Sequence, residues 1–410
     1  MSLQYRLQIY LTANRDIMSQ LTPFVSHISC TACSRHYPAD ALHTVCLDDG
    51  RPLEIVYDLV RLGKTHPGLT WMSSDEHSMW RYGHLLPISA PEALPSIGWT
   101  PLDSLPSGGF SGLNVYLKEE GEPRPGFGSN PTESFKDRGI GMAAAMAHFF
   151  GVSRLSIPTQ GNAGDALITL GKSLGQELYV AMPESTPAPI LERARKASES
   201  DPTLELLLSP GTIREAGALL RKATAGLDTF SVATFAEPGW RIEGKKTMGL
   251  EIIEQLGWEM PDVLVYPTGG GTGILGIWKA CQELLALGCV TGTPPRMIAV
   301  QSEGTDPLVK AMETGVEDSL PADAGETIAA GLNVPYGIGH KRVLEILRTS
   351  GGAAVTVGEA TMREEMSGRP SLSPEGAACL SVCRRLVDEG MAKPGERVVM
   401  INTCSPAKYE

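Results

Sequence analysis

The stretch DVLVYPTGGGTGILGIWKA, residues 262–280, connects a strand-like run to a helical run through a turn that is mostly glycine. In such a turn, backbone amides can approach an anion with no side chain in the way, and the expected ligand is a phosphate group. The residues that would hold it are Gly269, Gly270, Gly271, Thr272 and Gly273. We expect a bulky residue at Gly271 to occupy the phosphate position. A literal G-x-G-x-x-G from Gly271 to Gly276 leaves dinucleotide binding as an alternative.

Strand-like and helical runs alternate on both sides of this turn. The helical runs include RIEGKKTMGLEIIEQLG (241–257) and ILGIWKACQELLALG (274–288). The strand-like runs are LNVYLKE (113–119), RLSIPT (154–159), ELYVAMP (177–183), LELLLS (204–209), FSVAT (230–234), DVLVYP (262–267), MIAVQ (297–301), AAVTV (353–357) and RVVMIN (397–402). This alternation predicts an α/β fold with a mainly parallel sheet covered by helices on both faces. Ligands of such sheets bind where strands end and helices begin.

The composition indicates a globular protein that does not bind nucleic acid or membranes. The chain of 410 residues carries 35 Lys plus Arg against 47 Asp plus Glu, and its net charge of −12 works against binding to nucleic acid or anionic lipid. No apolar run approaches the length needed to cross a bilayer, and the start MSLQYRLQIYLTANRD is too polar for a secretory signal. We therefore expect a cytoplasmic protein.

A second candidate turn is PTESFKDRG, residues 131–139, where Lys136 lies in the first turn of a predicted helix. A lysine amine is a useful nucleophile only when it is unprotonated, and partial burial near a helix N-terminus or another cation lowers its pKa toward that state. The alternative is an ordinary solvated lysine, since lysines at helix starts are commonly exposed. Lys136 is thus a candidate nucleophile.

A third candidate turn is IPTQGNAG, residues 157–164, between a strand that ends at Thr159 and a helix that opens near Ala163. Unpaired amides at the helix start, together with the Asn162 side chain, could hold a carboxylate or a polar ring substituent. The alternative is that Asn162 only caps the helix.

The N-terminal cysteines have the spacing of an incomplete zinc ribbon. CTAC supplies Cys30 and Cys33, and Cys46 follows after a twelve-residue gap. A structural zinc site needs four ligands, and Asp49 stands where a fourth cysteine would be. Two histidines nearby could substitute, and they are His36 and His43. Either these residues bind zinc or the segment is a ribbon-shaped remnant held by packing.

The three turns together resemble those of a known enzyme family. A nucleophilic lysine, an asparagine loop and a glycine-rich turn are the parts that hold pyridoxal phosphate. The motifs are CTAC, GWTPL, NPTESFKDRG, GNAG, WRIEGKKTMGLEIIEQLG, PTGGGTG and NTCSPAKY. In this order they resemble the pyridoxal-phosphate enzymes of the tryptophan-synthase-β fold, fold type II, and among them the threonine synthase family. The resemblance implies two open, mainly parallel-sheet αβα domains with the cofactor in the cleft between them, and a short N-terminal zinc-ribbon-like segment.

The resemblance also implies roles for individual residues. Lys136 would bind the cofactor as an imine and then shuttle protons. Asn162 would contact the ring hydroxyl, and residues 269–273 would surround the cofactor phosphate. Thr403 would face the pyridine nitrogen. A neutral hydroxyl there cannot keep that nitrogen protonated, which favours elimination and replacement over transamination.

The family reaction and domain organisation follow from the same resemblance. Thr159 and Arg241 would bind the substrate, with Arg241 on its phosphate. The reaction would convert O-phosphohomoserine and water to threonine and phosphate in a homodimeric enzyme. The implied parts are an N-terminal segment of residues 1–84, a large domain of residues 85–135 plus 235–410, and a small mobile domain of residues 136–234.

Three departures from the family pattern leave other functions open. Glu133 replaces a glycine, and if its carboxylate points into the site, Glu133→Gly should improve use of a phosphorylated substrate. Phe235 and Glu237 replace small polar residues that help bind the substrate phosphate. The tail TCSPAKY also lacks the usual glycines. The alternatives are a serine or threonine dehydratase, a β-replacement enzyme of the same fold, and a non-enzymatic protein that binds pyridoxal phosphate.

Overall fold

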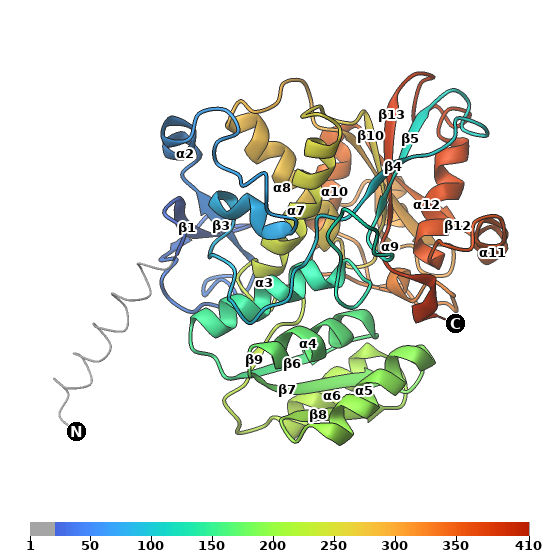
Figure 1. The fold of residues 1–410 in the computed structure, drawn as a ribbon. Coiled ribbons are helices and arrows are strands. Elements are labelled where there is room, and N and C mark those ends of the chain that lie inside the picture. Colours follow the sequence, from blue (N-terminus) through green and yellow to red (C-terminus); the bar gives the residue numbers. More distant parts are fainter. Residues whose placement is uncertain (1–20, 410) are drawn as a thin grey trace.

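The computed structural model describes residues 21–409 and contains two mainly parallel sheets and one small antiparallel sheet (Figure 1). The small sheet has the order β2-β1-β3 and lies near the N-terminus. Its strands are β1 (Val25–Cys30), β2 (His36–Tyr37) and β3 (Leu53–Tyr57). No helix within this described range is long and apolar enough to cross a membrane.

The larger parallel sheet has six strands in the order β12-β11-β10-β13-β5-β4, and only β4 runs antiparallel to its neighbour. Its strands are β4 (Leu102–Ser104), β5 (Asn114–Glu119), β10 (Val263–Pro267), β11 (Arg296–Ser302), β12 (Ala353–Val357) and β13 (Arg397–Asn402). The smaller parallel sheet has the order β8-β7-β6-β9. Its strands are β6 (Arg154–Pro158), β7 (Glu177–Pro183), β8 (Leu204–Ser209) and β9 (Phe230–Ser231).

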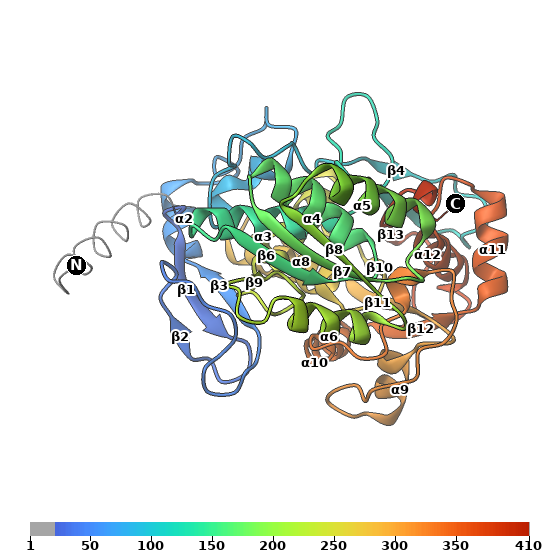
Figure 2. The ribbon, with the colours of Figure 1, turned by 90° about the horizontal axis from the view of Figure 1, so that it is seen from below.

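The helices cover both faces of these sheets, and Figure 2 shows the smaller sheet in front of the larger one. The α-helices are α2 (Leu59–Thr65), α3 (Lys136–Phe149), α4 (Asn162–Ser173), α5 (Ala188–Ser200), α6 (Ile213–Ala223), α7 (Trp240–Gln255), α8 (Thr272–Ala286), α9 (Pro307–Thr314), α10 (His340–Ser350), α11 (Glu359–Gly368) and α12 (Pro374–Arg385). The 3-10 helices are η1 (Met79–Leu85), η2 (Ala330–Leu332) and η3 (Pro406–Lys408).

Strand β10 illustrates why the predicted α/β class is confirmed. All five of its residues are buried, because helices cover both faces of the sheet. Val263 and Val265 pack into a core that includes α12, whereas Leu264 and Tyr266 pack into a core that includes α7 and α8. Alternate side chains of this one strand thus pack into two separate hydrophobic cores, one on each face of the sheet. The predicted strand-like runs all form strands, although FSVAT contributes only Phe230–Ser231.

A buried network of charges fixes α3 against α7 and β5. The Arg138 guanidinium donates to Glu120 at 2.7 Å and to Glu251 at 2.6 Å, and Lys118 Nζ donates to Glu251 at 2.8 Å. All four side chains are fully buried. A Cβ on Gly244 would collide with the Arg138 carbonyl, so the two helices approach closely where α7 carries this glycine. The network therefore fixes the position of α3, whose first residue is Lys136.

Candidate functional site

A cavity of about 320 Å³ lies between the two parallel sheets, where strands β6 and β10 end and helices α4 and α8 begin. It is lined from the smaller sheet by residues 157–163 and from the larger sheet by Gly270, Thr272 and the loop 330–338. Six of the residues predicted as site residues line it, and they are Lys136, Thr159, Asn162, Arg241, Gly270 and Thr272. The fold thus gathers residues from three separate turns around one space.

Lys136 is the first residue of α3, directly after Phe135 at the N-cap. Burial and the neighbouring positive charge of Arg241 lower the pKa of Lys136 to about 8, while Glu375 and Cys404 oppose this shift. A substantial fraction of the amine is therefore neutral near physiological pH. The geometry supports the prediction that this lysine can act as a nucleophile.

The turn that carries Asn162 is shaped by Gly161, whose φ of 135° is available to glycine and strained for other residues. Gly161 is the N-cap of α4, so the alternative that Asn162 caps this helix is wrong. The Thr159 hydroxyl accepts from the backbone amides of Gly161 at 3.1 Å and Gly164 at 3.2 Å, which fixes the turn. Asn162 Oδ1 is buried and has no partner among residues 21–409, so it is available to a ligand.

The glycine turn before α8 leaves one position open to the cavity. A Cβ on Gly269 would collide with the Gly331 carbonyl, and one on Gly273 would collide with the Tyr266 hydroxyl. At Gly271, where φ is 81°, a Cβ would collide with the Val343 side chain, and the expectation that a bulky residue here fills the phosphate position stays a prediction. Gly270 lines the cavity, and a Cβ on it would meet nothing within 4 Å. A bulky residue at Gly270 is the one that would enter the cavity.

Arg241 is a buried cation that forms no ion pair with any carboxylate in the described part of the chain. Its Nη1 donates to the Val232 carbonyl at 3.2 Å, and its buried Nε has no partner there. Burial lowers the pKa of Arg241, and it raises the pKa of the adjacent Glu237 to about 7 although Arg241 opposes that change. A buried guanidinium without an anionic partner is unfavourable by several kcal/mol. The site is therefore suited to an anion that enters from the cavity.

Four of the predicted cofactor-binding residues do not line the cavity, and they are Gly269, Gly271, Gly273 and Thr403. Thr403 is buried at the end of β13, and its carbonyl accepts from the Phe135 amide at 2.9 Å. It therefore lies beside the start of α3. Within residues 21–409 its hydroxyl forms no hydrogen bond, so the role of Thr403 at the ring nitrogen stays a prediction.

Tyr409 and Glu375 belong to the site although the sequence does not assign them a role. Tyr409 lines the cavity and donates to Glu375 Oε1 at 2.7 Å, which also accepts from the Gly331 amide at 2.8 Å. Glu375 Oε2 is buried without a partner in residues 21–409. Tyr409 closes the motif NTCSPAKY, which was its only signal. Glu375 is far from that motif in the sequence, and no sequence signal points to it.

The two unusual residues Glu133 and Phe235 both have positive φ, at 54° and 63°. A residue without a Cβ is favoured in that region, which explains why glycine suits position 133. The Glu133 side chain does not line the cavity, so the condition for its expected effect on substrate use is not met. Phe235 does line the cavity.

The N-terminal cysteines converge as predicted, on the small antiparallel sheet. One ligand atom from each of Cys30, Cys33, Cys46 and Asp49 lies within 4.8 Å of the others. Neither His36 nor His43 belongs to this cluster.

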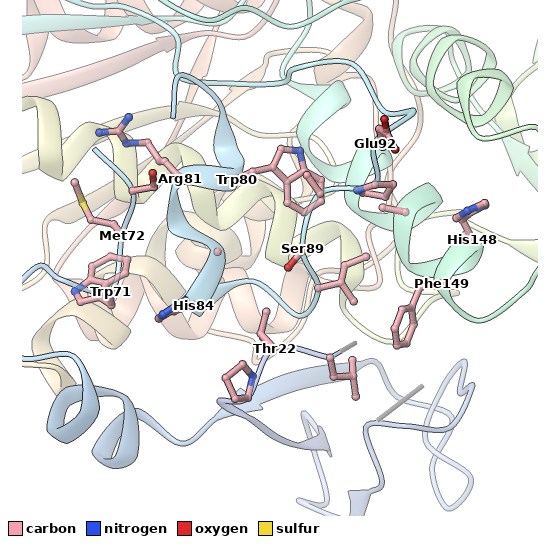
Figure 3. Close-up of a pocket in the computed structure, with 18 of the residues that line it drawn as sticks. Thr22, Trp71, Met72, Trp80, Arg81, His84, Ser89, Glu92, His148 and Phe149 are labelled. Carbon is pink, nitrogen blue, oxygen red and sulfur yellow. The ribbon is translucent and has the colours of Figure 1, made fainter. Parts of the chain in front are cut away.

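A second and larger cavity, of about 960 Å³, lies at the other end of α3 (Figure 3). It is lined by Trp80, Arg81 and His84 from η1 and by His148 and Phe149 from the last turn of α3. It contains none of the predicted site residues. The cavity at Lys136 is therefore the candidate active site.

The residues around Lys136 fit pyridoxal phosphate. They offer a lysine of lowered pKa, a buried amide oxygen without a partner, and helix-start amides beside a glycine that leaves open space. A family profile described as pyridoxal-phosphate dependent enzyme matches residues 93–403. The chain therefore belongs to the family of pyridoxal-phosphate-dependent enzymes. The predicted cofactor is confirmed, and the match gives no support to the dinucleotide alternative.

Relatives with curated names narrow the class further. The threonine synthase of Methanosarcina acetivorans is 29% identical over 388 residues, which cover 92% of this chain and 91% of that protein. The threonine synthase of Methanocaldococcus jannaschii is 28% identical over 384 residues, with 91% of each chain covered. The predictions of a pyridoxal-phosphate-dependent lyase and of a resemblance to the threonine synthase family are thus confirmed.

Solved structures share the fold at lower identity. A fungal L-serine ammonia-lyase from Rhizomucor miehei superposes with a TM-score of 0.62 and 21% identity, and covers 75% of this chain and 94% of its own. The processed form of threonine deaminase isoform 2 from Solanum lycopersicum has a TM-score of 0.60 and 20% identity, and covers 75% of this chain and 84% of its own. These likenesses establish the fold and leave the substrate open.

Proposed function

We propose that this lyase converts O-phosphohomoserine and water to threonine and phosphate. The observation that carries the proposal is the buried Arg241 guanidinium, which lines the cavity of Lys136 and has no carboxylate partner in residues 21–409. A substrate phosphate would supply the missing anion and two acceptors for the planar fork of donors. A substrate with only a neutral hydroxyl in its side chain would offer the guanidinium no anionic contact from that side chain, and Glu237, whose pKa is raised to about 7, balances its charge only in part.

The remaining site residues suit distinct parts of the substrate and cofactor. The amides at the start of α4, with Thr159 and Asn162, are placed to hold a carboxylate or the ring hydroxyl. Gly270 and Thr272, at the start of α8, are placed to hold the cofactor phosphate. Arg241 therefore stays available for the second phosphate, that of the substrate.

Lys136 would be the residue that moves protons. Pyridoxal phosphate, when bound, supplies an electron sink for negative charge at the substrate Cα. The neutral Lys136 amine would remove protons from Cα and Cβ, and phosphate would leave from Cγ. Water would add its hydroxyl group at Cβ, and protons would return to Cγ and Cα. Thr403 as the neutral group at the ring nitrogen would disfavour transamination. A lysine pKa of about 8 suits a base that must both accept and return protons near neutral pH.

We further propose that residues 136–234 form a small domain that closes over the cavity. The cavity is lined from both sheets, and Gln160 Nε2 donates to the Asn333 carbonyl at 2.9 Å across it. Closure would exclude water from the reacting carbon atoms. Gln160→Ala should then raise the KM for substrate and weaken closure, which the protection that substrate gives the exposed Tyr336 against chymotrypsin would report. The homodimer implied by the family resemblance stays a prediction.

A dehydratase of serine or threonine is the second candidate. Glu237 favours it, because this buried carboxyl beside Arg241 would repel a phosphate when it is ionised. The pKa of Glu237, raised to about 7, keeps much of it neutral near physiological pH, which reduces this repulsion.

Product analysis distinguishes the candidates. The purified holoenzyme should release phosphate and threonine from O-phosphohomoserine and form little keto acid from serine or threonine. Lys136→Ala should abolish turnover and the borohydride-trapped adduct at position 136, as read by peptide mass spectrometry. Keto acid from serine or threonine without phosphate release would establish the dehydratase. Cofactor binding without turnover of any of these amino acids would establish the non-enzymatic alternative.

A further inference from the structure

The N-terminal sheet brings four potential metal ligands together in a geometry that fits a tetrahedral ion. Cys33 Sγ and Cys46 Sγ lie 3.6 Å apart, and Cys30 Sγ lies 3.5 Å from both Asp49 carboxylate oxygens. For zinc with Zn–S of about 2.3 Å and Zn–O of about 2.0 Å, a tetrahedron requires sulfur atoms about 3.8 Å apart and sulfur–oxygen distances of about 3.5 Å. The ligand spacing therefore matches that of a zinc site.

The surrounding backbone and Tyr37 direct donors at the sulfur atoms. The amides of Ala32 and Cys33 lie 3.4 and 3.5 Å from Cys30 Sγ, and the Tyr37 hydroxyl donates to Cys46 Sγ at 3.2 Å. Donors of this kind stabilise thiolates, the form in which cysteine binds a metal. A segment held together by packing alone would not require these hydrogen-bond donors. Cys33 is exposed, so it contributes little to a hydrophobic core.

The geometry selects Asp49 over the two histidines as the fourth ligand. His43 Nε2 lies 3.0 Å from the Pro38 carbonyl, and the His36 ring lies 4.0 Å from the ring of His27. Both rings are thus engaged elsewhere. Asp49 is held toward the sulfur atoms by the Arg51 amide, which donates to its Oδ1 at 2.9 Å.

We propose that Cys30, Cys33, Cys46 and Asp49 bind one structural zinc ion. Three thiolates and a carboxylate suit zinc, whereas calcium and magnesium require mostly oxygen ligands. A closed set of four protein ligands leaves no open position, so the ion is structural and takes no part in the reaction. The site is independent of the proposed substrate.

The zinc would stabilise the N-terminal sheet, which contacts α7, the helix that carries Arg241. Gly239, the N-cap of α7, lies against β3 so closely that a Cβ on it would be 2.8 Å from the Leu53 carbonyl. Tyr57, the last residue of β3, donates to Glu243 of α7 at 2.7 Å. The ribbon therefore contacts the first turn of α7 through two separate points.

Metal analysis of the full-length holoenzyme tests the proposal. The protein, purified without chelators, should contain about one zinc per chain by atomic emission. Cobalt exchanged into the wild-type site should give the intense sulfur-to-cobalt absorption of a tetrahedral thiolate site. Absence of bound metal in the wild type after incubation with zinc would overturn the proposal, and so would a cobalt spectrum without thiolate bands.

Matched variants identify the fourth ligand. Asp49→Asn should weaken zinc binding about a hundredfold or more in competition with a chromophoric chelator, and Tyr37→Phe should weaken it about 10- to 100-fold. Asp48→Asn is the control, because it makes the same change next in sequence at a residue that pairs with Arg35 and lies outside the cluster. Equal affinity of the two asparagine variants would show that Asp49 is no ligand and overturn the assignment. Asp49→Cys should retain zinc.

Discussion

Replacing Arg241 by methionine should separate the catalytic use of this charge from its effect on stability. Methionine keeps most of the side-chain volume of Arg241, a residue that is 3% exposed, and removes the guanidinium, which has no ion-pair partner in residues 21–409. If Arg241 holds the substrate phosphate, the variant should lose activity toward O-phosphohomoserine. Because the unpaired charge is unfavourable in the empty site, the same variant should unfold less readily.

The structure sets the size of both effects. Loss of charge-assisted hydrogen bonds to a phosphate removes about 3 kcal/mol, which is roughly a hundredfold in kcat/KM. For stability, removal of a buried charge in favour of an apolar group gains on the order of 1–4 kcal/mol, and the lost hydrogen bond to the Val232 carbonyl costs about 1 kcal/mol. A net rise of up to about 3 kcal/mol in the free energy of unfolding is expected.

Phosphate release and urea unfolding without phosphate or substrate provide the two measurements. Arg154→Met is the control, since Arg154 lies on β6 in a partly exposed ion pair with Glu177 and should change neither quantity. Full activity of Arg241→Met toward O-phosphohomoserine would refute the assigned role. A clear loss of stability would show that the guanidinium is compensated within the protein and refute the physical reasoning.

Three further changes test the rest of the site. Gly270→Val should place a side chain in the cavity and weaken pyridoxal phosphate binding at least about tenfold by equilibrium dialysis, with unchanged circular dichroism; unchanged affinity would place the phosphate elsewhere. The rate at which Lys136 of the apoprotein captures pyridoxal phosphate can be followed by trapping the product with borohydride. This rate should increase about tenfold per pH unit below pH 8 and level off above it, because the pKa of Lys136 is lowered to about 8. A rate that keeps rising toward the ordinary pKa of 10.5 would contradict that shift. Glu133→Gly should raise the free energy of unfolding by roughly 0.5–1 kcal/mol by relieving a φ of 54° and leave turnover unchanged, and an increase in kcat/KM would mean that the carboxylate reaches the substrate.

The sequence predicted the fold well where local patterns and tertiary structure agree. The runs AAVTV and RVVMIN correspond to β12 and β13 residue for residue, because short runs rich in β-branched and apolar residues with clear ends are typical of strands in a parallel sheet. Lys136 begins a helix as expected, and its turn, the glycine turn and the asparagine turn meet at one cavity. That meeting follows from the rule that ligands bind where parallel strands end.

Other features depend on contacts that a sequence pattern cannot contain. The space that a side chain at position 271 would need is occupied by Val343, more than seventy residues later. The pairing of Tyr409 with Glu375 joins the end of η3 to the first turn of α12, and no local signal connects them. Asn162 was expected to be a possible cap, but the unusual backbone of Gly161 begins the helix one residue earlier than an asparagine cap would. Such juxtapositions arise only when the whole chain packs.

The buried charge network also has a consequence for the synthesis of the chain on the ribosome. Arg138 is joined to Glu251, a residue 113 positions further along, and both side chains are fully buried. Its other partner, Glu120, precedes it in the chain, but until residue 251 has left the ribosomal tunnel the Arg138 guanidinium lacks Glu251 and cannot be buried with both carboxylates. The Lys136 end of the site therefore cannot be completed while the first half of the chain is alone. A gene fragment that ends near residue 235 would yield a chain that requires its second half, supplied separately, in order to fold.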